Sequence, residues 1–158
     1  MKVTKVALLE SINSALDKHD QAVKDWQAAV IVWRERQAAK WQAEKAPQWK
    51  ALRDLLTKKL NKGQPVTQKD IEGALTTRSS TGYRSFYLSD FVFTPDQTPS
   101  GAITVNGVRV SPPTSNYVAD LRALKLFLEG SPDESFSLES LSRLGFKAPA
   151  FVFRAAVS

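Results

Sequence analysis

The sequence predicts an α+β protein that is mostly helical, with a long N-terminal helix or helical hairpin followed by a small C-terminal unit. Three features indicate this fold. Residues 5–44 contain neither proline nor glycine, an Asn-Gly pair lies between β-branched residues within 103–110, and leucines recur at helical spacing near the C terminus. We therefore expect the C-terminal unit to contain a β-hairpin and two helices. The expected boundary separates a basic helical domain, 1–62, from a small α+β domain, 63–158.

The long N-terminal helix is predicted from composition and periodicity together. Residues 5–44 are rich in alanine, glutamine, lysine and glutamate, which are good helix formers. Apolar or weakly polar side chains recur mostly at steps of three and four, which places them on one helical face. This face comprises Leu8, Ile12, Ala15, His19, Val23, Trp26, Val30, Trp33 and Trp41.

Such a helix would be about 60 Å long, whereas a compact chain of this size has a radius of gyration of about 15 Å. The helix should therefore project, pair with another chain, or have a second helix folded along it. Pro47 is expected to break it, because proline lacks the backbone N–H and clashes with the preceding turn. A second helix is predicted over 48–60. A short third helix should follow, with Thr67 as its N-cap and Asp70 completing a capping-box-like pair.

The next part of the chain shows strand signals. Residues 84–94 contain four aromatic side chains and are predicted to form a strand. Residues 103–110 should form a β-hairpin, because Asn106 and Gly107 are the pair that type I′ turns favour.

Two helices are predicted near the C terminus. The first covers 116–129, with Ser115 as its cap. The second is short, begins after Ser137 and ends at Gly145. The apolar tail, 146–158, is expected to be a strand or a docked extension.

The segment 121–146 has the pattern of the first half of a helix-turn-helix motif. It places a leucine-rich helix, a Ser-Pro-Asp-Glu turn and a short helix in succession. No second half is expected, because the remaining tail is apolar and offers only Lys147 and Arg154 for contacts to DNA.

The residue types that carry most enzyme chemistry are scarce in this chain. It has no cysteine, which excludes disulfides, thiolate metal sites and cysteine nucleophiles, and its seven glycines are isolated, which excludes phosphate-binding glycine loops. The single histidine, His19, lies on the apolar face and is interpreted as a half-buried structural residue rather than a metal ligand or catalytic base. Asp133 and Glu134 are interpreted as solvated turn charges. We expect no enzyme activity, no metal, no cofactor and no small-molecule substrate.

The N-terminal apolar run is interrupted by Glu10, which is too early for a signal sequence or a membrane span. No other stretch approaches 18 apolar residues. Together with the lack of cysteine, this favours a soluble, cytoplasmic protein with no membrane partner.

The net charge of +6 is concentrated in one region. Residues 1–70 contain 14 basic and 8 acidic side chains, whereas 71–158 contain 8 of each. The basic segment 34–62 overlaps the last two tryptophans, and basic residues interspersed with aromatic ones can hold nucleic acid. The positive charges are expected to spread around two helices rather than lie on one face, and an ordinary solvated surface is the alternative. The candidate nucleic-acid-binding residues are Arg34, Arg36, Lys40, Lys45, Lys50, Arg53, Lys58 and Lys59.

The four tryptophans, at spacings of 7, 8 and 8 residues, are Trp26, Trp33, Trp41 and Trp49. The rings either pack in a core or form an exposed aromatic stripe that binds a partner, since aromatic residues dominate binding hot spots. Packing in a core is favoured for these rings, and we expect Trp26 and Trp33 in particular to lie on a face that protein covers.

The overall layout resembles that of small uncharacterised proteins encoded by phages of actinobacteria. The long opening helix, the segment 65–75 and the leucine-rich segment 121–146 carry the resemblance. It implies a phage product made in the host cytoplasm that acts on or alongside a larger partner.

Together, these features predict that the protein is a non-enzymatic interaction protein. Its long N-terminal helix would bind a host or phage macromolecule, or a second copy of the chain. Nucleic-acid binding through the basic segment 34–62 is the alternative.

Overall fold

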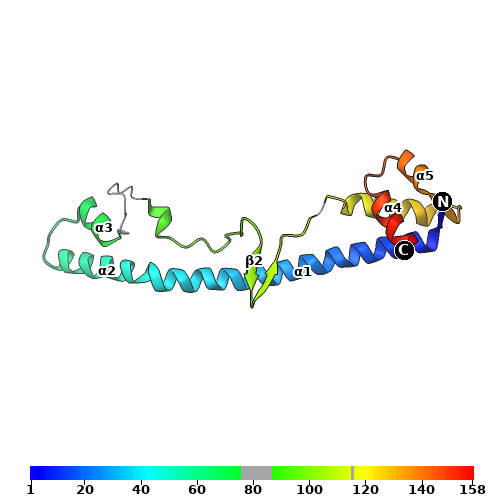
Figure 1. Ribbon diagram of the computed structural model, residues 1–158. Helices are drawn as coiled ribbons and strands as arrows, with labels where there is room; N and C mark the ends of the chain where they lie inside the picture. Colours follow the sequence, from blue (N-terminus) through cyan, green and yellow to red (C-terminus); the bar gives the residue numbers. More distant parts are fainter. Residues whose placement is uncertain (76–86, 115) are drawn as a thin grey trace, which may run out of the picture. The chain divides into compact units, whose positions relative to one another are not determined.

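The computed structural model describes three parts of the chain and confirms the predicted fold class. The protein is mostly helical, with a long N-terminal helix and a smaller C-terminal part that combines helices with two-stranded sheets (Figure 1). The described parts are residues 1–75, 87–114 and 116–158.

The chain divides into two compact units. The terminal unit comprises Met1–Ala29 and Gly101–Ser158, and the central unit comprises Val30–Ser100. This division differs from the expected boundary after residue 62. The long helix contributes its first part to the terminal unit and its remainder to the central unit.

The long helix α1 covers Lys5–Glu44 without interruption, as the sequence predicts. Its first turns pack in the terminal unit against α4 (Val118–Gly130), α5 (Leu138–Arg143) and α6 (Pro149–Val157). Apolar residues at helical spacing on α1 and α4 meet in one core. That core contains Val3, Leu8, Ile12, Ala15, Leu121, Leu124, Leu128, Phe136, Leu141, Val152 and Phe153.

A short sheet closes the terminal unit. Strand β1 (Lys2–Thr4) pairs antiparallel with β4 (Ser135–Ser137), and Val3 lies opposite Phe136. This sheet could not be predicted from the sequence, because three residues per strand are too few to show an alternating pattern.

The predicted hairpin is confirmed, and it consists of β2 (Ile103–Val105) and β3 (Val108–Val110). Asn106 and Gly107 have φ values of 51° and 78°, as a type I′ turn requires.

The C-terminal tail is not a strand but a helix, α6, and it is docked as the second alternative expected, because Val152 and Phe153 are buried in the core of the terminal unit. α5 begins with a reciprocal capping box between Ser137 and Ser140 and is followed by Gly145 at φ 82°. The chain then starts again as α6, with Pro149 in its first turn, a position that proline favours. The tail was difficult to predict because α6 is apolar on most sides. The expected cap Ser115 lies outside the described residues, and Tyr117 occupies the N-cap position of α4.

The junction between α1 and α2 (Ala46–Asn61) is less of a break than Pro47 predicts. Lys45 keeps helical backbone angles, with φ −105° and ψ −37°. Its N–H donates to the Trp41 carbonyl at 2.7 Å, and its own carbonyl accepts from the Trp49 N–H at 3.2 Å. These are helical hydrogen bonds across the junction. α2 therefore continues the path of α1 and does not fold back as a hairpin (Figure 1).

The central unit has a small core of its own. α3 (Gln68–Ala74) begins at the predicted N-cap Thr67 and packs against α2. Leu52, Leu75 and Phe91 are buried together, and parts of Trp49, Leu56, Ile71 and Ala74 cover them.

The strand predicted over 84–94 is not found in the part that the structure describes. Residues 84–86 lie outside the described ranges, and the rest contains a short 3-10 helix, η1 (Leu88–Asp90). A strand requires a partner for its backbone polar groups. Here the carbonyl of Phe91 finds its partners in tryptophan side chains instead.

Candidate nucleic-acid interface

Two tryptophans hold the segment that follows η1 against the long helix. Trp41 lies near the end of α1 and Trp49 near the start of α2, and the indole N–H of each donates to the Phe91 carbonyl at 2.8 Å. Phe91 itself is only 3% exposed. Both tryptophans are half-buried. They therefore stabilise the central unit and are not a free aromatic surface.

Two of the candidate cations reinforce the same contact. The Lys45 ammonium lies 4.9 Å from the centroid of the Phe91 ring, within the range of a cation–π interaction. The Arg34 guanidinium donates from Nε to the Gln97 carbonyl at 2.9 Å and from Nη2 to the Asp96 carbonyl at 3.4 Å. Both cations are thus engaged within the protein.

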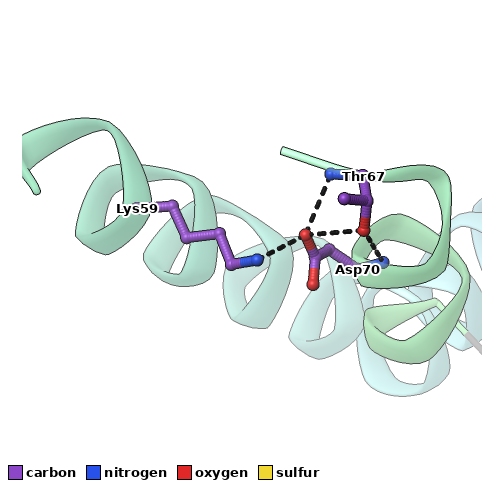
Figure 2. Close-up of polar contacts among 3 residues, drawn as sticks. All are labelled: Lys59, Thr67 and Asp70. Carbon is purple, nitrogen blue, oxygen red and sulfur yellow. Dashed lines mark hydrogen bonds and ion pairs between the residues drawn. The ribbon is translucent and has the colours of Figure 1, made fainter. Parts of the chain in front are cut away.

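A third candidate cation, Lys59, joins α2 to α3 (Figure 2). Its Nζ lies 2.5 Å from Oδ2 of Asp70, and the same oxygen accepts hydrogen bonds from the backbone N–H and the hydroxyl of Thr67, both at 2.9 Å. The hydrogen bond from Lys59, followed by those from Thr67, lowers the pKa of Asp70 from 3.8 to about 2. The carboxylate is therefore ionised at neutral pH, and it keeps Lys59 occupied.

Four of the remaining cations are exposed away from these contacts, although Lys40 also lines a small pocket with Trp41, Lys45 and residues within 89–97. At 100° per residue, Arg34, Lys45 and Lys59 fall within an arc of about 40° on the packed side. The opposite side carries a second set, within an arc of about 80° centred roughly 160° away. We call this set the outward cationic face, and it consists of Arg36, Lys40, Lys50 and Lys58, all of them exposed.

The outward cationic face exists because the helical phase is kept across the junction at Lys45. With 1.5 Å per residue, it extends about 33 Å from Arg36 to Lys58. Lys40, Lys50 and Lys58 form no ion pair with any residue that the structure describes. The eight candidate cations therefore spread around α1 and α2, as expected, but these four share one side.

The eighth candidate, Arg53, lies beside this face and pairs with Asp54 at 3.2 Å. Asp54 falls within the arc of the outward cationic face and reduces its charge at that point. Both side chains are about 70% exposed, at 68% and 72%. Solvent screens such a pair, which contributes little to stability and leaves Arg53 available to a stronger anion.

The other two tryptophans lie in different units. Trp26 belongs to the terminal unit and Trp33 to the central unit, and both are half-buried. The four rings therefore do not form one exposed stripe. The contacts of Phe91, Asp96 and Gln97 with the helix could not be predicted from the sequence, because they are made through backbone carbonyls that no side-chain pattern reveals.

His19 has the structural surroundings that the sequence suggests. It is half-buried, and its ring packs edge-on against Tyr117 with the centroids 6.4 Å apart. Across the described ranges, no three histidine or acidic side chains gather as metal ligands would. A search of the same ranges for a helix with the length and hydropathy to cross a bilayer finds none.

Comparisons of the chain with protein-family models, with curated proteins and with solved structures found no match. The functional proposal therefore depends on the geometry and charge of the chain itself.

Proposed function

We propose that this is a non-enzymatic binding protein whose long helix contacts nucleic acid through the outward cationic face. One observation carries the proposal: the exposed cations Arg36, Lys40, Lys50 and Lys58 share one side of α1 and α2. The cations on the opposite side are held by groups of the central unit. The four exposed cations therefore lie on a different side of the helix from Arg34, Lys45 and Lys59.

The dimensions of this face suit a phosphate backbone. Duplex DNA carries one phosphate per about 3.4 Å of each strand, so a row of cations about 33 Å long spans roughly one helical turn. Cations that neutralise phosphates release condensed counterions, and this release drives binding without reading sequence. The proposal is accordingly one of sequence-independent contact with the backbone.

A protein partner on the tryptophan stripe has less support. Trp41 and Trp49 already bind the Phe91 carbonyl, and Leu8 and Ile12 are covered by the terminal unit's own core. The surface that α1 leaves exposed in the central unit is mixed, with Arg36 and Lys40 beside Glu35 and Glu44, and it offers no aromatic side chain to a protein partner. The setting implied by the phage resemblance, a host cytoplasm rich in nucleic acid, is part of the same proposal.

Salt-dependent binding tests this proposal. Fluorescence anisotropy with a labelled duplex should show a logarithm of affinity that falls linearly with the logarithm of salt concentration. In the double variant Lys40→Gln/Lys50→Gln, the slope should decrease by up to about 1.8, because two phosphate contacts are lost.

A matched control makes the same charge change in the terminal unit. Lys2→Gln/Lys24→Gln alters two exposed lysines there that lie off the side of the outward cationic face, and it should leave the slope almost unchanged. If both double variants reduce the slope equally, overall charge rather than the outward cationic face determines binding. Absence of duplex binding at low salt would refute the proposed function.

A further inference from the structure

The C-terminal helix of the terminal unit borders an open groove of about 790 Å³. This volume falls within the range typical of ligand sites. All of the groove's lining belongs to the terminal unit, on α6, the turn before it and the N-cap of α4. The side chains that matter here are Tyr117, Lys147, Ala148, Phe151, Arg154 and Ala155.

An aromatic pair forms the apolar part of this groove. Phe151 is 56% exposed, and the centroid of its ring lies 6.0 Å from that of Tyr117, with 49° between the planes. Tyr117 is in turn supported by His19. Ala148 and Ala155 are small and leave space beside the exposed ring. A flat apolar group that covered Phe151 would remove this exposed aromatic surface from water.

Two cations accompany the aromatic pair. Lys147 lies in the turn before α6 and Arg154 lies on α6, and both are exposed. Neither forms an ion pair with any residue in the described ranges. The groove therefore combines a ring surface with two unneutralised positive charges, which fits a ligand that has a flat ring and an anionic group.

We propose that this groove binds a nucleotide of a single strand. The base stacks on Phe151 beside Tyr117, and a phosphate contacts Lys147 and Arg154. Aromatic side chains and cations are combined in this way where proteins bind single strands without sequence preference. The inference rests on the proposed nucleic-acid binding and adds a base-contacting site in the other unit.

α6 also supplies the helix that follows α5 in a helix-turn-helix order, of which the sequence indicates only the first half. α5, Gly145 and α6 follow one another, and Leu141 and Val152 are buried in the shared core. Direct reading of a duplex requires polar side chains that reach base edges in the major groove. The exposed side of α6 offers Phe151 and the single cation Arg154, a combination better suited to stacking on an unpaired base.

A short single strand tests the groove separately from the outward cationic face. An oligothymidylate of about eight nucleotides lies within the site size of single-strand binders, and an abasic strand of the same length has the same phosphates without bases. The full chain should bind the oligothymidylate more tightly. Phe151→Ala should lower that affinity by at least about fivefold and leave the abasic strand unaffected, because only stacking is lost. Lys147→Gln/Arg154→Gln should weaken binding of both strands.

Two further variants keep the result interpretable. Leu126→Ala removes another exposed apolar side chain of the terminal unit and should change neither affinity. Phe151→Leu retains an apolar side chain of similar size without a ring face, so it should still lose affinity for the oligothymidylate even if Phe151→Ala is unstable.

Several outcomes would overturn the inference. One is equal affinity for the two strands. Another is oligothymidylate binding that neither Phe151 variant changes, which would leave duplex binding through Lys40 and Lys50 intact as the proposed function. A third is binding at this groove of a phenylalanine-containing acidic peptide but of neither strand, which would identify a peptide site instead.

Discussion

Phe91 shows how single side chains fix a segment that has little regular secondary structure. Its buried carbonyl accepts hydrogen bonds from both Trp41 and Trp49, and its ring contacts the ammonium of Lys45. A buried carbonyl without any partner is costly, typically by about 1–3 kcal/mol. The two indoles therefore act as alternatives for one acceptor, so that either of them still satisfies it when the other is absent.

This redundancy predicts a non-additive response to substitution. Trp41→Phe and Trp49→Phe should each reduce the free energy of unfolding by about 1 kcal/mol, since one hydrogen bond is lost. The double variant should lose more than the sum, because the Phe91 carbonyl then has neither indole. Urea unfolding measures all three. Trp26→Phe makes the same change of ring size away from Phe91, and a double-variant loss no greater than the sum would contradict the shared-acceptor account.

Asp70 provides a pH-dependent prediction at the same scale. Its pKa in the folded protein is about 2, below the ordinary value of 3.8, chiefly because Lys59 donates a hydrogen bond to the carboxylate. A lowered folded-state pKa stabilises the fold above pH 3.8, and that contribution is lost as the pH falls from 3.8 through about 2. The stability difference between the wild type and Asp70→Asn should therefore shrink over this interval.

Lys59→Gln tests the cause of that shift. Removal of the ammonium should raise the pKa of Asp70 toward 3.8, measured by NMR titration of its carboxyl carbon. A pKa that stays near 2 in this variant would show that the bonds from Thr67 are sufficient.

Among the elements, those with strong local signals were predictable. The steps of three and four on α1, the Asn106–Gly107 turn and the Ser137 cap each specify their structure through neighbouring residues. β1 and α6 were missed, because the short strand depends on a partner more than 130 residues away in sequence and the helix lacks a clear polar face. The aromatic residues near Phe91 looked like a strand because their pairing with tryptophan side chains cannot be read from the sequence.

The outward cationic face could not be predicted for a related reason. Its residues lie before and after Pro47 in sequence. They can share one side only if the helix continues through the proline. In the sequence alone this proline indicates a break, which would place the charges on two unrelated helices. The structure keeps Lys45 helical, which brings Lys40 and Lys50 onto one side.

The continuity of α1 and α2 leads to a prediction for Pro47. Pro47→Ala restores an N–H that can bond the preceding turn, so the variant should be at least as stable as the wild type, with a gain of up to about 3 kcal/mol. Thermal unfolding followed by circular dichroism measures this. Were the proline needed to turn the chain into a hairpin, the alanine variant would instead be destabilised.

At the scale of the whole molecule, the charge is distributed unequally between the two units. Residues 30–100 contain 12 basic and 7 acidic side chains, whereas the rest of the chain contains 10 and 9. The central unit therefore has a net charge of +5 and the terminal unit a net charge of +1. A polyanion should be attracted first to the central unit, where the outward cationic face lies. The groove beside Phe151 would then contact an unpaired base by stacking rather than by long-range attraction.

Lysine footprinting tests the outward cationic face most directly. The protein is treated with an amine-reactive reagent with and without duplex DNA, and mass spectrometry reports how much each lysine is modified. We predict that DNA protects Lys40, Lys50 and Lys58, whereas Lys2 and Lys24, exposed in the terminal unit, remain reactive. Equal protection of all five lysines, or protection of none, would contradict the assignment of nucleic-acid binding to this face.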